Sequence, residues 1–140
     1  MKRKQLVKLP DSELDIMMLL WSAQKGCRVA DIFYGLKDSH PLSKAAIHTL
    51  IERLEGRGFI RVDTVDAPSP YKMIYPIVTE NEYRAVESES FVDKLFRGSW
   101  KGLIASLVDI GRITEADIDE ISRMIREKEA KCTAAKEEEE

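Results

Sequence analysis

The chain has 140 residues, of which 44% are hydrophobic, so it is long enough for one or two small domains with buried cores. Its formal net charge of −3 is unevenly divided: residues 1–78 carry 12 Lys and Arg against 9 Asp and Glu, whereas residues 79–140 carry 10 against 16. Only the first part therefore suits a polyanionic partner. The two cysteines lie far apart and form no Cys-x-x-Cys pair, which argues against a disulfide framework and a zinc site.

Basic residues open the chain, but no apolar segment follows them, so we expect no export signal. The longest apolar run, residues 16–21, is far shorter than the ~20 residues of a membrane span. We therefore expect a cytoplasmic protein with no membrane insertion.

Helical spacing of the apolar residues predicts three helices in the first part of the chain, over residues 12–23, 29–36 and 44–56. Ser12 and Asp15 match a capping box at the start of the first helix. Its apolar cluster, Trp21 with Met17 and Met18, is expected in the core. The third helix has a favourable N-cap in Ser43, and the glycines at 56 and 58 end it.

A β-hairpin and then a different kind of domain are predicted next. Residues 59–65 and 71–78 suit two strands, and the two prolines in the link 66–70 favour an exposed loop. Three more helices follow, over residues 80–97, 99–109 and 115–129. Thr79 is expected to cap the first of them, and Thr114 with Asp117 forms a capping box for the last. Residues 130–140 are low in complexity, so we expect an acidic, disordered tail.

This order predicts a mainly α fold with a small β-hairpin. A helix followed directly by a hairpin is typical of a winged helix-turn-helix, here residues 1–78, and three helices form a second domain over 79–129. These last helices are short and carry more apolar residues than they can bury alone. We therefore predict a homodimer, which is most often built with twofold symmetry. The predicted interface comprises Tyr83, Phe91, Leu95, Trp100, Leu103, Ile104, Leu107, Ile118, Ile121 and Ile125.

The helix at 44–56 is the candidate reading helix. Its apolar stripe (Ile47, Leu50, Ile51 and Leu54) leaves the opposite edge free for a partner. A helix in the major groove presents short or hydrogen-bonding side chains at its centre, as Ala45, His48 and Thr49 would. Cationic side chains nearby would contact phosphates. The full set of predicted DNA contacts is Ser43, Lys44, Ala45, His48, Thr49, Arg53, Arg57 and Lys72.

Other classes of function find less support. Neither His40 nor His48 has partners at ligand or nucleophile spacing, so we predict no catalytic residue, no metal site and no cofactor. Glu52 on the reading edge, together with Asp63 and Asp66 near the wing, repels phosphate. These carboxylates favour one alternative, a winged-helix protein-interaction module that has lost DNA binding.

The order and spacing of several segments resemble the penicillinase-repressor family of the BlaI/MecI type, with the copper-responsive CopY type as a branch. The likeness covers residues 8–129. Its segments are LPDSELDIM at 9–17 with Leu20 and Trp21, Ser43 with IHTLIERL at 47–54, GFI at 58–60, YPIVTENEY at 75–83, and SFVDKLF at 90–96 with Gly98 and Ser99.

The resemblance implies a homodimeric winged-helix repressor that binds a palindromic operator and blocks transcription of resistance or stress genes by occluding a promoter. In the β-lactam branch, a membrane sensor metallopeptidase leads to cleavage of the repressor in its dimerisation region. In the copper branch, C-terminal cysteine pairs bind metal.

This chain departs from the family pattern in several places. Lys44, Ala45 and Ala46 stand where members often have Pro-Lys-Thr, and the wing lacks the usual basic and glycine residues. There is no C-terminal Cys-x-Cys, so copper sensing is not expected. The segment cleaved in the β-lactam branch aligns with residues 105–107, which lack the usual Asn-Phe pair.

Overall fold

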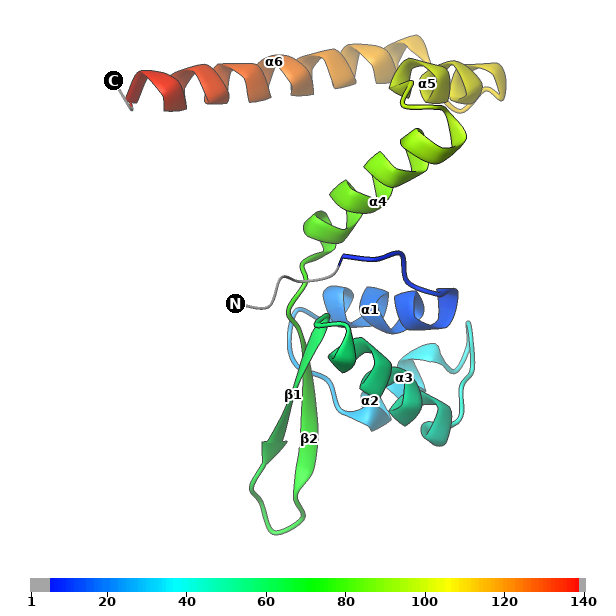
Figure 1. Ribbon diagram of the computed structural model, residues 1–140, viewed down its shortest axis with the longest axis vertical. Helices are drawn as coiled ribbons and strands as arrows, with labels where there is room; N and C mark the ends of the chain where they lie inside the picture. The colour runs from blue at the N-terminus through cyan, green and yellow to red at the C-terminus, as the bar shows by residue number, and fades with distance from the viewer. Residues whose placement is uncertain (1–5, 139–140) are drawn as a thin grey trace. The chain divides into compact units, whose positions relative to one another are not determined.

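The computed structural model describes residues 6–138 and divides into two compact units, Met1–Ser90 and Phe91–Glu140. The first residues of the predicted basic start, 1–5, and the last two of the predicted acidic tail, 139–140, lie outside the described part. Figure 1 labels the helices and strands, and each unit is described by itself.

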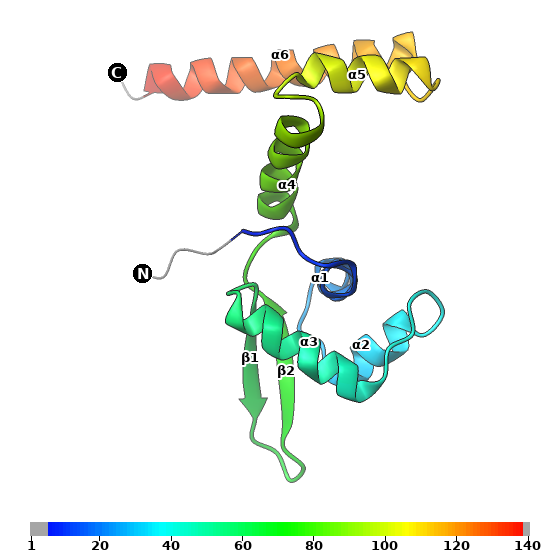
Figure 2. The ribbon, with the colours of Figure 1, turned by 45° about the vertical axis from the view of Figure 1, so that its right-hand side comes forward.

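The first unit is a winged helix-turn-helix. It contains α1 (Asp11–Ala23), α2 (Val29–Leu36), α3 (Lys44–Gly56), β1 (Ile60–Val65), β2 (Tyr71–Pro76) and the first turns of α4 (Glu80–Leu95). The strands pair antiparallel, from Ile60 opposite Pro76 to Val65 opposite Tyr71. The hairpin extends beyond the three helices, as Figures 1 and 2 both show. The predicted mainly α fold with one hairpin is confirmed.

Local capping explains why α3 begins and ends where predicted. Ser43 Oγ accepts a hydrogen bond from the Ala46 N–H at 3.1 Å. At the other end Gly58 has φ +80°, which a residue without Cβ adopts at little cost. The Phe59 N–H then donates to the Leu54 carbonyl at 3.0 Å, and the chain turns directly into β1.

The start of α1 differs from the prediction. The helix begins at Asp11 after Pro10, whose φ of −58° already suits a helix start, and no side chain caps it. The expected capping box of Ser12 and Asp15 is therefore wrong. Met18 also differs, because its side chain is 44% exposed, whereas Met17 is fully buried.

The core of the first unit lies between the three helices and the base of the hairpin. Trp21 lies partly buried at its edge and donates from Nε1 to the Val78 carbonyl at 2.9 Å. The buried apolar residues are Leu9, Ile16, Met17, Leu20, Cys27, Ile32, Leu36, Ile47, Leu50, Ile51, Leu54, Phe59, Ile60, Ile74, Val78 and Tyr83.

The second unit is helical, with the end of α4, then α5 (Trp100–Asp109) and α6 (Glu115–Glu138). Ser99 caps α5, and Thr114 with Asp117 caps α6 as predicted. The helix α6 continues well beyond residue 129, so the predicted disorder of the tail is wrong for residues 130–138. Within residues 91–135 no side chain is buried.

Within the described residues, no helix is both long enough and apolar enough to cross a membrane.

Candidate nucleic-acid interface

The two edges of α3 separate as the apolar stripe predicts. Ile47, Leu50, Ile51 and Leu54 are all buried against the core. The side chains on the other edge are exposed: Lys44, Ala45, His48, Thr49, Glu52 and Arg53. Two side chains on that edge, Ala45 and Thr49, lie one turn apart and are short, so the helix backbone can come close to a partner there. Figure 2 shows α3 beside the hairpin.

Thr49 lies in the middle of the exposed edge, and its hydroxyl proton is already used. Thr49 Oγ1 donates to the Ala45 carbonyl one turn earlier, at 3.2 Å. The outward face of this side chain therefore offers a methyl group and the lone pairs of an oxygen. Both are groups that a base edge can recognise, the methyl by thymine and the acceptor by an exocyclic amino group.

Three other predicted contacts lie around the same helix. Ser43 is held as the N-cap, and its hydroxyl keeps a proton to donate. Lys44 Nζ lies 5.5 Å from the centroid of the Phe33 ring, so α2 supports this cation at the start of α3. Arg53 is exposed in the last turn.

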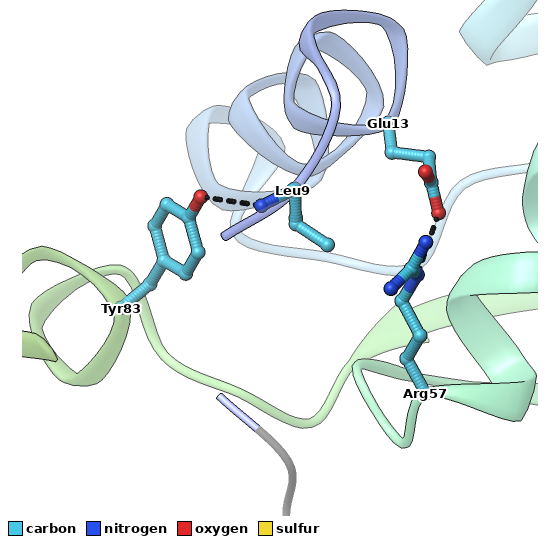
Figure 3. Close-up of polar contacts among 4 residues, drawn as sticks. All are labelled: Leu9, Glu13, Arg57 and Tyr83. Carbon is cyan, nitrogen blue, oxygen red and sulfur yellow. Dashed lines mark hydrogen bonds and ion pairs between the residues drawn. The ribbon is translucent and has the colours of Figure 1, made fainter. Parts of the chain in front are cut away.

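Arg57 is placed differently from the prediction. Its Nε donates to Glu13 Oε1 at 3.1 Å, and the Glu13 side chain is only 1% exposed (Figure 3). The arginine thus neutralises a buried carboxylate of α1, with 35% of its own side chain exposed. We therefore withdraw Arg57 from the set of free phosphate contacts, because its charge is already paired.

The hairpin adjoins the exposed edge of α3. A hollow of about 200 Å³ is lined by His48, Glu52 and Glu55 from α3, by Thr64 and Lys72 from the hairpin, and by the apolar Val29, Ile51, Val62 and Ile74. The structure thus brings Lys72, an exposed cation, to the same face as His48. Two carboxylates, Glu52 and Glu55, also line this hollow. The sequence pattern predicted only Glu52 on this edge.

The predicted dimer residues fall into two groups. Tyr83 is 6% exposed and belongs to the first unit: its hydroxyl accepts a hydrogen bond from the Leu9 N–H at 3.0 Å, as Figure 3 shows. Burial raises the pKa of this phenol. It is therefore a core residue, and we withdraw it from the interface. The other nine are exposed or half-buried, namely Phe91, Leu95, Trp100, Leu103, Ile104, Leu107, Ile118, Ile121 and Ile125.

Two aromatic rings of β2 carry stacked arginines that the sequence analysis missed. The guanidinium carbon of Arg28 lies 3.4 Å from the centroid of Tyr71, and that of Arg61 lies 4.6 Å from the centroid of Tyr75. Arg61 and Tyr75 are partners in the hairpin register, so that pair was readable from the strand alignment. Arg28 reaches Tyr71 through a long-range contact that leaves no local pattern.

No group of three or more His, Cys, Asp or Glu side chains in the described part of the chain is placed to hold a metal ion.

Comparison with known proteins gives consistent matches over most of the chain. The family model described as penicillinase repressor matches residues 9–127. The chain is 24% identical over 122 residues to the methicillin resistance regulatory protein MecI of Mammaliicoccus sciuri, covering 86% of this chain and 94% of that protein. It is 20% identical over 124 residues to the penicillinase repressor of Bacillus licheniformis, with 89% and 94% covered. Among solved structures, the heme sensor protein PefR of Streptococcus agalactiae in complex with heme is 22% identical, with a TM-score of 0.44 over 88% of this chain and 74% of that one.

Proposed function

Because this chain belongs to the penicillinase repressor family, whose members are transcriptional repressors and not enzymes, we propose that it acts as a homodimer on a palindromic operator and occludes a promoter. One observation carries the DNA-binding part of this proposal. The exposed edge of α3 presents the short side chains of Ala45 and Thr49 beside a hairpin that brings Lys72 to the same face.

The geometry supports a division of labour among the α3 residues. Ala45, His48 and Thr49 lie where a helix in the major groove meets base edges, and these contacts would specify sequence. Lys44, Arg53 and Lys72 are exposed cations around them, and Ser43 adds a hydroxyl donor. Contacts from these groups to phosphates would fix the register and supply the salt-dependent affinity. Such a protein works where chromosomal DNA lies, so we place it in the cytoplasm.

The second unit supports the dimer. Its large apolar side chains find no core of their own in residues 91–135, and a second copy would bury them. A twofold dimer presents two reading helices to two half-sites about one DNA turn apart, which is why a palindromic operator is expected. We assign residues 1–78 to DNA binding and residues 79–129 to dimerisation, except that Tyr83 belongs to the core of the first unit.

Release of the operator by proteolysis in the second unit is the switch that the family implies, with a membrane sensor metallopeptidase as the partner. The candidate segment, residues 105–107, lies inside α5, where Ala105 and Ser106 are exposed. The helix must open locally before a protease can bind this segment in an extended form.

Two glutamates favour a second candidate function, the binding of a protein partner. Glu52 and Glu55 line the hollow between α3 and the hairpin, and carboxylates there oppose a polyanion. A winged-helix module that binds a protein partner would have no need to avoid them. One gel-shift experiment separates the two functions.

That experiment is a gel-shift titration of the full chain with two labelled duplexes of equal length, one from the region upstream of its own gene and one of mixed sequence. We expect retardation of the upstream duplex at lower protein concentration. Thr49→Ala should weaken binding to the upstream duplex about tenfold, and should leave binding to the mixed duplex unchanged, because one base contact is worth about 1–3 kcal/mol.

The matched control is Thr133→Ala on α6, since Thr133 Oγ1 also donates to the carbonyl one turn earlier, Glu129 at 2.9 Å. Its binding should equal that of the unmodified chain. Equal losses on both duplexes for Thr49→Ala would remove its assigned base contact. Absence of retardation by a folded dimer would favour the interaction module.

A further inference from the structure

The wing loop between β1 and β2 supplies no positive charge of its own. Residues 66–70 are all exposed, and they include Asp66 but neither lysine nor arginine. A cation beside the loop would add to the salt-dependent part of the affinity, because that part comes from phosphate neutralisation. A cation beside the loop must therefore come from the strands of the hairpin, as Lys72 does, or from another element.

Arg28, the residue before α2, is placed to provide it. Its guanidinium carbon lies 3.4 Å from the centroid of the Tyr71 ring. Tyr71 is the first residue of β2 and pairs with Val65 at the end of β1, so the charge is held at the base of the wing loop. A guanidinium stacked on a ring keeps its N–H groups at the edge, where they can bind a phosphate with two parallel hydrogen bonds.

The backbone around Arg28 is fixed on both sides, so little freedom is lost when it binds. Cys27 bridges to Ile74 of β2, with N–O distances of 3.0 and 2.8 Å. The Arg28 backbone N–H donates to Asp31 Oδ2 at 2.9 Å, so this carboxylate is hydrogen-bonded to the backbone of Arg28. Among the side chains of residues 6–135, the Arg28 guanidinium takes part in no ion pair, which leaves its charge available.

The residue after Arg28 borders α3. Val29, the next residue, lines the hollow that His48 of α3 and Lys72 of the hairpin share. The start of α2, the exposed edge of α3 and the hairpin therefore meet around one hollow. Side chains alternate along β2, so Tyr71 and the Arg28 stacked on it lie on the other face of the hairpin from Lys72. The base of the loop thus has one cation on each face.

We propose that Arg28, held by Tyr71, makes the phosphate contact that the wing loop itself lacks. The inference rests on the DNA binding proposed above and names a further residue of that interface. Arg28 is the contacting group, and Tyr71 is a positioning residue that acts through it. An acidic wing loop is then compatible with operator binding, because its cation comes from a neighbouring helix start.

The test compares Arg28→Ala with Tyr71→Leu, which removes the aromatic face but keeps a large apolar side chain. Affinities for the upstream and mixed-sequence duplexes are measured by fluorescence anisotropy between about 50 and 200 mM salt. Arg28→Ala should weaken binding to both duplexes about three- to tenfold and lower the slope of log K against log salt by about 1. Tyr71→Leu should cause a smaller loss, and the double variant should bind no more weakly than Arg28→Ala.

Arg126→Ala removes the same charge from an exposed position on α6 and should keep the slope of the unmodified chain. Circular dichroism melts establish that each variant is folded. If the unmodified chain binds the upstream duplex and Arg28→Ala keeps the full slope, the Arg28 contact is refuted while the proposed repressor function stands. If the unmodified chain binds neither duplex, both proposals fail together.

Discussion

Among the residues that the structure describes, Glu13 is the one buried charged side chain. Its partner Arg57 follows α3 directly, and the Arg57 N–H donates to the carbonyls of Arg53 and Glu55. The ion pair therefore joins α1 to the end of α3 (Figure 3). A buried carboxylate is costly unless it is paired, so the contact constrains where α3 ends relative to α1. We infer that Arg57 positions the helix and does not itself bind DNA.

Glu13→Gln tests this ion pair. The amide keeps one hydrogen-bond acceptor but loses the negative charge opposite the arginine. We expect the free energy of unfolding to fall by about 1–3 kcal/mol, less than for a fully buried pair, because Arg57 is 35% exposed. Urea unfolding should show a lower midpoint with an unchanged slope.

Glu55→Gln serves as the control for this measurement, since Glu55 is an exposed carboxylate on the neighbouring helix. Its free energy of unfolding should stay within about 0.5 kcal/mol of that of the unmodified chain. An unchanged midpoint for Glu13→Gln would mean that the ion pair contributes nothing to holding α1 and α3 together.

At the scale of elements, sequence patterns located the helices where local signals are strong. The observed bounds of α2 and α3 agree with the predicted ones, because both have a clear apolar period and because Ser43 and Gly58 mark the two ends of α3. The tail was mispredicted because low complexity was interpreted as disorder. Its Ala, Lys and Glu are strong helix formers, and no Gly or Pro follows Gly111, so nothing stops α6.

The candidate site was predictable only where it depends on one helix. The period of α3 sorted its buried and exposed edges correctly. The pairing of Arg57 with Glu13 and the burial of Tyr83 were not predictable, because each depends on a partner far away in the chain: Leu9 and Tyr83 are 74 residues apart. Stacking of Arg28 on Tyr71 likewise depends on a distant part of the chain, where Cys27 bridges to Ile74.

The cap of α6 gives a prediction about pH. The Thr114 N–H and the Thr114 hydroxyl both donate to Asp117 Oδ2, at 2.9 and 3.0 Å. These hydrogen bonds, first from the backbone and then from the side chain, lower the pKa of Asp117. The ionised carboxylate is therefore favoured by folding: its contribution is present above the unfolded pKa of about 3.9 and is lost as pH falls through the lower folded pKa.

Asp117→Asn removes this titration. We expect the helical circular dichroism signal of the unmodified chain to fall more steeply below about pH 4 than that of the variant, and the variant to be less stable at neutral pH. The carboxyl carbon of Asp117, followed by NMR, should titrate below about 3.9. Asp119→Asn is the control, because Asp119 is an exposed carboxylate two residues further along α6. Identical acid profiles for the chain and Asp117→Asn would contradict the role of the capping box.

At the scale of the whole molecule, the two units differ in how they satisfy their apolar residues. The first unit closes its own core, and Tyr83 belongs to it through ring contacts of 5.8 Å with Trp21 and 5.9 Å with Phe59. For this reason the compact unit extends to Ser90 and includes the first turns of α4, beyond the predicted boundary at residue 78. The second unit leaves Leu95, Trp100 and the isoleucines of α6 in solvent.

Ile125→Asp tests whether a second copy covers these side chains. Ile118, Ile121 and Ile125 follow one face of α6, and Ile125 is 53% exposed. An aspartate there would be buried without a partner in a dimer, so we expect sedimentation to shift toward the monomer. Losing the second reading helix should weaken binding to the upstream duplex about 10²- to 10⁴-fold, because a palindromic site is held by both subunits at once.

Ala116→Asp is the matched control, since residue 116 lies opposite the isoleucine face and in the first turn of α6, where a carboxylate is tolerated. It should remain a dimer and bind normally. A dimeric Ile125→Asp with full affinity would mean that this face of α6 lies outside the interface. A monomeric variant that still binds the upstream duplex fully would separate the two halves of the proposal: the apolar face would be a dimer contact, and one α3 would be enough to hold the DNA.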